Sequence, residues 1–251
     1  MKSTQAQQRS HRQKHLLREL LRSNWRGVAE TIAMMLGLTL ASGLLLPLMQ
    51  TFWTFALVQM TSLLGAENPG VGLVPVFQGQ WERLQVPTLH YLFPAPNHHD
   101  WLINLGGATV TFLLAGLAPA LLRVPLRLLS VLHVFCVVLG GLGTQVATDI
   151  APHAKSLATL TLCLILLMPL LLALTHSIIE PRAPHRAWVC ALCSGYLAFS
   201  LPFKLIGHMV LLDLLGPLAM PTLFLLFGPA LDLLAVVAIY AWALSWQQEA
   251  V

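Results

Sequence analysis

Between Leu157 and Ile179 the chain reads LATLTLCLILLMPLLLALTHSII, without one Asp, Glu, Lys or Arg. A helix of about 20 residues crosses the hydrocarbon core of a bilayer, which is about 30 Å thick. No water is present there to satisfy free backbone N–H and C=O groups, so such a stretch must be helical. This run therefore predicts a transmembrane helix.

Five further stretches have the same apolar character and length, at 28–48, 101–122, 127–148, 187–206 and 221–244. The chain of 251 residues is 57% hydrophobic and 10% charged, whereas soluble domains carry about 25% charged residues. This composition excludes a soluble domain, and it excludes disorder, which requires high charge and low hydrophobicity. The predicted fold is all-α: a polytopic bundle of six transmembrane helices that forms one domain over residues 27–251.

Two segments between the first and second spans are less regular. Residues 49–65 either extend the first helix or lie on the membrane surface. The loop at 66–100 is rich in Pro and Gly, and its segments GLVPVF and QVPTLHYLF are candidates for a short β-hairpin. The other connections are short, so successive helices should pack as antiparallel neighbours.

The N-terminal segment, residues 1–26, predicts a basic amphipathic helix. Basic side chains recur there at every fourth position: Lys14, Arg18, Arg22 and Arg26. This spacing places them on one helical stripe, where each can contribute roughly 1 kcal/mol to binding an anionic leaflet. They could equally serve only as the topogenic flank of the first span. The net charge of +4 comes mostly from this tail, so it does not indicate nucleic-acid binding.

The distribution of basic residues predicts the orientation. Eleven of the 14 Lys and Arg residues lie in the N-terminal tail and in the connections at 123–127 and 180–186, against Arg83, Lys155 and Lys204 on the other side. Because Lys and Arg are enriched in cytoplasmic loops, both termini should be cytoplasmic and the 66–100 loop should face outward. The expected location is a plasma membrane or a bacterial inner membrane.

Ionisable side chains inside a span are costly and mark functional candidates. Asp232 lies about 16 Å along its helix from Pro221, near the bilayer midplane. It is either a carboxylate that binds a proton or cation, or a hydrogen-bonding group between helices. Lys204 and His208 complete the set of transport or ion candidates, and Thr144 and Gln145 are further polar groups of the same candidate path.

A second set of candidates shares one depth in the predicted cytoplasmic leaflet. It comprises two histidines and three cysteines: His133, Cys136, His176, Cys190 and Cys193. Two facing imidazoles could hold a b-type haem, and sulfur ligands with imidazole suit copper(I) or zinc. Packing is the competing interpretation, since cysteine is often buried and histidine often bridges membrane helices.

A third set ends the outer loop: His98, His99 and Asp100. These side chains could bind a cation, respond to pH near neutrality, or act as acid–base groups of an intramembrane enzyme on a lipid-linked substrate. A solvated loop is the simpler interpretation, with Asp100 capping the helix that follows.

Familiar catalytic signatures are missing from the sequence: it has no phosphate-binding glycine loop, no H-E-x-x-H and no G-x-S-x-G. The segments outside the spans are too short for a catalytic domain. The leading hypothesis is therefore a non-enzymatic membrane subunit of a transport system or larger membrane complex, with other membrane subunits as partners. The alternatives are a haem- or metal-binding redox protein and an enzyme at the outer interface.

Overall fold

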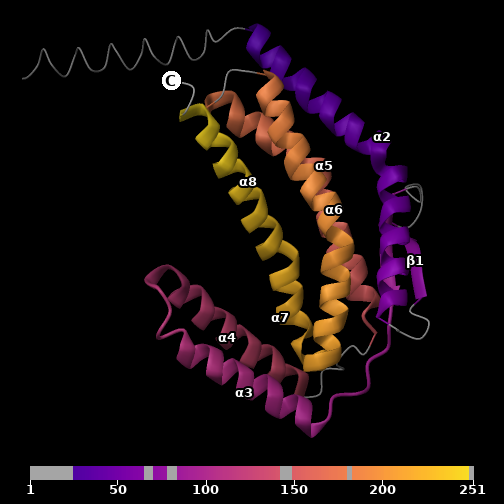
Figure 1. Cartoon of the computed structure of the whole chain (residues 1–251), viewed down its shortest axis with the longest axis vertical. Coiled ribbons are helices and arrows are strands. Elements are labelled where there is room, and N and C mark those ends of the chain that lie inside the picture. Colours follow the sequence, from indigo (N-terminus) through magenta and orange to yellow (C-terminus); the bar gives the residue numbers. More distant parts are fainter. Residues whose placement is uncertain (1–24, 65–69, 78–83, 142–148, 180–182, 249–251) are drawn as a thin grey trace, which may run out of the picture.

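A computed structural model describes residues 25–64, 70–77, 84–141, 149–179 and 183–248 of the chain. Four long helices alternate in direction (Figure 1): α2 (Trp25–Leu63), α5 (Ala151–Ile179), α6 (Ala183–Leu215) and α8 (Leu231–Gln248). The first residues of α2 and the last residues of α8 lie at the same end of the molecule. The core lies where α5 and α6 pack on each other and on α2.

Helix α2 is a single helix of 39 residues with Pro47 inside it. Residues 49–63 therefore extend the first span instead of lying on the surface. Trp53 explains why this half of α2 is held in place: its side chain is 0% exposed, and its indole N–H donates to the carbonyl of Ala198 on α6 at 2.7 Å.

The β-hairpin predicted in the long loop is confirmed. Strand β1 (Gly70–Pro75) pairs antiparallel with β2 (Gln85–His90), with Val71 opposite Leu89. Strand β2 packs against α5, and Val86 and Leu89 are fully buried there. The hairpin therefore belongs to the core, and it lies at the end of the bundle opposite the first residues of α2 and the last residues of α8 (Figure 1).

Helices α3 (His98–Leu114) and α4 (Ala120–Gly141) form a helical hairpin that diverges from the other helices (Figure 1). The stretch predicted as one span, 101–122, is divided here by a turn after Leu114. Proline disfavours helical geometry at the residue before it, and Pro119 lies at this turn. The basic connection predicted at 123–127 is instead part of α4.

The last apolar stretch is also divided. After α6 the chain forms η1 (Pro217–Ala219), α7 (Met220–Leu225) and a π-helical turn, η2 (Leu226–Ala230), before α8. Gly228 in this turn has non-helical dihedrals, φ −91° and ψ −107°. The stretch 221–244 was predicted as one span in which Pro229 marks a bend, and the structure places a break of the regular helix at Gly228 and Pro229.

The described residues are 83% helical, and they confirm the membrane fold class in its general form. Large apolar side chains cover the exposed faces of α2, α3 and α4, Leu44, Leu113 and Leu121 among them, as expected for surfaces that face lipid. Among the described residues, five segments are long and apolar enough to cross a membrane: Ala29–Leu63, Ala120–Leu139, Ala151–Leu172, Ala187–Leu215 and Pro217–Ala243.

Candidate functional site

The most deeply buried charges in the described part of the chain form one cluster between α5, α6 and α8. The ammonium group of Lys204 donates to Asp232 Oδ1 at 2.6 Å and to Thr161 Oγ1 at 3.1 Å. The Thr161 hydroxyl donates in turn to Asp232 Oδ2 at 3.2 Å. Each of the three residues comes from a different helix, so the cluster joins all three.

Burial makes this arrangement electrostatically demanding. The side chain of Lys204 is 3% exposed and that of Asp232 is 0% exposed. Removing a single ion from water costs several kcal/mol, roughly, even after the protein relaxes. Each charge is therefore tolerated here only because the opposite charge and the Thr161 hydroxyl lie within hydrogen-bond distance.

Lys204 corrects the sequence interpretation. The fifth span was expected to end at 206, which placed Lys204 and His208 at its outer boundary, but α6 continues to Leu215. In the sequence, two polar side chains near the end of an apolar run indicate that the helix ends there. Here they lie inside the helix because Asp232 compensates the lysine, so Lys204 no longer belongs among the outer basic residues.

The break before α8 explains how Asp232 reaches the cluster. Asp232 lies in the first turn of α8, where the helix dipole favours a negative charge. A Cβ atom on Gly228 would lie 2.9 Å from Leu157 Cδ1. The close approach of η2 to α5 therefore uses the missing side chain of Gly228.

Two histidines lie beside the cluster, toward the β-hairpin end. His208 is one turn after Lys204 on α6 and is 2% exposed, and its Nε2 atom has no hydrogen-bond partner among the described residues. The ring of His153, half-buried on α5, lies 6.5 Å from that of His208 between centroids. His153 and Thr161 are separated by two turns of α5, about 12 Å. The histidines thus continue the cluster toward the beginning of α5.

Of the three residues predicted as transport or ion candidates, the structure pairs Asp232 with Lys204 and places His208 one turn further along α6. Their role in ion movement stays a prediction. The sequence interpretation missed Thr161, whose only signal is its spacing of four and eight residues from Leu157 and His153 on one face of α5. Thr144 and Gln145 lie outside the described residues.

The predicted layer of histidine and cysteine does not form one metal site in the described residues. His133 on α4 has its Nδ1 atom 2.8 Å from Thr222 Oγ1, whereas Cys190 and Cys193 are buried on α6 and Cys136 is half-buried on α4. No group of three or more His, Cys, Asp or Glu side chains in the described part of the chain is placed to hold a metal ion. The side chain of His176 lies outside the described residues, so its pairing with His133 around a haem stays a prediction.

The candidates at the start of α3 have an evident structural role. Asn97, and not Asp100, is the N-cap: its side chain accepts the backbone N–H groups of His99 and Asp100. Asp100 completes a capping box, because its Oδ2 atom accepts the N–H of Asn97 at 2.9 Å. His98 and His99 are exposed, and an acid–base role for the three side chains stays a prediction.

Two polar contacts attach the end of β2 to the long helices. Tyr91 donates its hydroxyl to Asp213 Oδ1 on α6 at 3.2 Å. His90 Nδ1 lies 3.9 Å from Asp149 Oδ2, and both side chains are well exposed, so this contact contributes little. Burial, followed by the charge and hydrogen bond of Asp213, raises the pKa of Tyr91 above its ordinary value.

The predicted N-terminal amphipathic helix lies outside the described residues, which begin at Trp25. Lys14, Arg18 and Arg22 fall in that segment, and the side chain of Arg26 is likewise not described. Binding of this tail to an anionic leaflet stays a prediction.

Comparisons of the chain with protein-family models, with curated proteins and with solved structures find no match. The function is therefore inferred from the geometry of the described residues.

Proposed function

We propose that this chain is a subunit of a membrane transport system in which the Lys204–Asp232 pair takes up and releases a proton. The observation that carries this proposal is the cluster of Lys204, Asp232 and Thr161, whose side chains are hydrogen-bonded to one another between α5, α6 and α8. Ionisable groups at such depth are expensive, and in membrane proteins they often mark ion pathways and proton relays.

A proton fits the cluster better than a metal cation does. The ammonium group of Lys204 already lies 2.6 Å from the carboxylate, so a metal ion would meet a like charge at close range. A proton needs no set of ligands and adds directly to an oxygen of Asp232. Its uptake removes the attraction between Asp232 and Lys204, so protonation loosens the contact between α8 and α6.

The break at η2 supports movement at this point. Discontinuous helices near the bilayer midplane are a recurring feature of transporters, and their half-helix ends point at the binding site. Here Asp232 lies in the first turn after the break. A change in its charge therefore acts directly on the helix end that follows the π-helical turn.

The two histidines supply a route to the cluster. His153 is half-buried near the start of α5, and His208 lies between it and Lys204 with a free Nε2 atom in the described structure. A centroid distance of 6.5 Å is too long for a direct hydrogen bond, so a water molecule between the rings would complete the relay. This route opens toward the β-hairpin end.

The proposed orientation follows from the basic residues. With Lys204 inside the bundle and Arg123 and Arg127 within α4, nine Lys and Arg residues of the N-terminal tail and the 180–186 connection oppose only Arg83 and Lys155 on the other side. Both termini are then cytoplasmic and the β-hairpin end faces outward, in a plasma membrane or bacterial inner membrane. The proton enters from the outside in this arrangement.

Proton flux into proteoliposomes tests the proposal. The purified chain is reconstituted with a pH-sensitive dye inside the vesicles, and a potassium diffusion potential drives proton entry. We expect flux with the wild type and with Glu30→Gln, a change of an exposed acid on α2, but little with Asp232→Asn. The asparagine amide oxygen can still accept the Thr161 hydroxyl, so a monodisperse variant without flux supports the role of the charge. Equal flux with Asp232→Asn, or none with the wild type, would overturn the proposal.

A further inference from the structure

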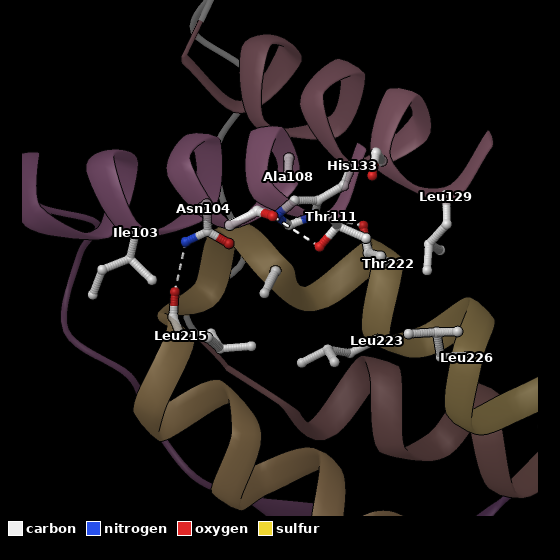
Figure 2. Close-up of a pocket in the computed structure, with 13 residues that line it drawn as sticks. Ile103, Asn104, Ala108, Thr111, Leu129, His133, Leu215, Thr222, Leu223 and Leu226 are labelled. Carbon is white, nitrogen blue, oxygen red and sulfur yellow. Dashed lines mark hydrogen bonds between the residues drawn. The ribbon is translucent and has the colours of Figure 1, made fainter. Parts of the chain in front are cut away.

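A partly open pocket of about 220 Å³ lies between the α3–α4 hairpin and the chain from Leu215 to Leu226 (Figure 2). It is separate from the Lys204–Asp232 cluster and shares no lining residue with it. The lining is mostly apolar, and its described residues include no Asp, Glu, Lys or Arg. Its polar members are Asn104, Thr111, Ser130, His133 and Thr222.

Ser130 is the unusual residue of this pocket. It is 3% exposed, and its hydroxyl has no hydrogen-bond partner among the described residues. Serine and threonine inside a helix ordinarily bond to the carbonyl four residues earlier, as Thr109 and Thr111 do on the facing helix α3. A buried hydroxyl without a partner is unfavourable, so Ser130 indicates that something else in the pocket accepts or donates this bond.

His133 offers a second polar atom on the same side of the pocket. It follows Ser130 by three residues on α4, so the two side chains share a helix face. Thr222 holds the Nδ1 atom of the ring at 2.8 Å (Figure 2). The imidazole is thereby fixed in orientation, and its Nε2 atom has no partner within the described chain.

Asn104 keeps the opposite wall in place. Its amide nitrogen donates to the carbonyl of Leu215 at 2.6 Å (Figure 2) and to that of Asp100 at 2.7 Å. The bond to Leu215 attaches α3 to the end of α6, and the bond to Asp100 lies within α3, so this wall of the pocket is held without a ligand. Its polar groups divide accordingly: Asn104 supports the wall, while Ser130 and His133 are available to a ligand.

We infer that this pocket binds the uncharged head of a lipid-soluble molecule through an oxygen that hydrogen-bonds to Ser130 and His133. The absence of charge among the described lining residues disfavours an ionic head. The volume lies below the range of about 300–1,000 Å³ typical of whole small-molecule ligands, so the pocket fits a head group whose tail leaves through the open side. The outer faces of α3 and α4 carry exposed Val110, Leu113 and Leu128, along which an apolar tail would lie.

Two lipid-soluble classes present such an oxygen: the ring of a quinone and the head of a diacylglycerol. Decylubiquinone and dioctanoylglycerol are therefore titrated separately into the purified chain in a sugar-headed detergent, and the unfolding temperature is measured. A ligand that binds only the folded protein raises this temperature. Stabilisation by one probe identifies its class, and stabilisation by both identifies the head oxygen alone as the feature recognised.

Neighbouring glycines on α3 provide a matched pair of variants. A Cβ added at Gly106 or Gly107 meets no atom within 4 Å, so leucine at either position should fold, but only Gly107 lines the pocket. We expect the stabilisation to persist in Gly106→Leu and to disappear in Gly107→Leu. Ser130→Ala should weaken binding about fivefold through loss of one hydrogen bond, whereas Ser156→Ala, on an exposed face of α5, should not change it. The inference is overturned if neither probe stabilises the wild type, or if Gly107→Leu binds as tightly as Gly106→Leu.

Discussion

At the scale of single residues, Lys204 and Asp232 depend on each other. Both are almost fully buried, and each is the other's only described partner of opposite charge. Breaking a buried ion pair from one side typically costs about 3–5 kcal/mol, whereas replacing both members by apolar residues is often neutral. The pair is therefore a poor source of net stability, and its presence is better explained by what the charges do.

This reasoning predicts the outcome of a double-mutant cycle. Lys204→Met and Asp232→Leu should each lower stability by about 3–5 kcal/mol because a buried charge loses its partner. The double variant should recover most of the loss, since the freed Thr161 hydroxyl can turn to the carbonyl of Leu157. The measurement is thermal unfolding in detergent, followed by tryptophan fluorescence. Additive losses in the double variant would show that the two charges are not coupled.

Tyr91 makes a pH-dependent contribution to the stability of the folded chain. Burial first, and then Asp213, raise the pKa of Tyr91 above the ordinary value of 10.0. A pKa raised in the folded state means that the stabilisation is complete below the unfolded value and is lost as the pH rises through the folded value.

The ultraviolet absorbance of tyrosinate checks this direction. Tyr91 is one of three tyrosines in the chain, so the difference between the wild type and Tyr91→Phe isolates its titration. We expect ionisation above the ordinary pKa, and an earlier ionisation in Asp213→Asn. Titration of Tyr91 at or below the ordinary value in the folded protein would contradict the contact.

The sequence made these residues visible to different degrees. Asp232 could be predicted as a functional candidate because placing a carboxylate inside a membrane span costs free energy. Lys204 was recognised as polar but misplaced, because its partner lies on another helix. Thr161 could not be singled out, since a threonine in a membrane helix can always bond to its own backbone.

At the scale of elements, the turn after α6 depends on one glycine. Gly216 has φ +78°, and a Cβ atom there would lie 2.9 Å from Asp100 Cγ. Gly216→Ala should therefore lower stability by about 1–3 kcal/mol, from a backbone region that favours glycine and from the contact with α3. The unfolding temperature measures this loss. Gly195→Ala on α6, where no atom lies within 4 Å of the added Cβ, should leave it unchanged or raise it; equal losses in both would contradict this role for Gly216.

Apolar length and turn residues predicted that most of the helices and strands exist, but they did not predict where each one begins and ends. The hairpin of β1 and β2 was predicted from its alternating segments and is confirmed. The 101–122 stretch failed as one helix because the turn before Pro119 outweighs its hydrophobicity. Helix α6 extends beyond the predicted end at 206. Lys204 is paired with Asp232 on α8, and Asp213 accepts the hydroxyl of Tyr91, and no local pattern reveals these contacts.

At the scale of the whole molecule, the first residues of α2 and the last residues of α8 lie at the same end (Figure 1). Both termini should therefore face the same compartment. Epitope tags at the two ends should be accessible together in inside-out vesicles and protected together in right-side-out vesicles. An impermeant maleimide should label His98→Cys, an exposed position at the start of α3, only from the opposite side. Tags accessible from opposite sides would contradict this arrangement.

Composition alone was enough to predict a membrane fold, because a chain with 10% charged residues cannot cover itself with water-facing groups. The candidate site was harder to predict, since it requires knowing that α5, α6 and α8 meet. A pattern of side chains along one helix does not determine which faces of different helices come together. That information exists only in the packed structure.

The most direct test of the central proposal is to observe the proton on Asp232 itself. An infrared difference spectrum between alkaline and acidic buffer is recorded for the chain in lipid vesicles. We expect a protonated-carboxyl band that is present in the wild type and in Glu30→Gln and is lost in Asp232→Asn. A carboxylate of Asp232 that stays ionised throughout the pH range in which proton flux occurs would contradict the proposed function.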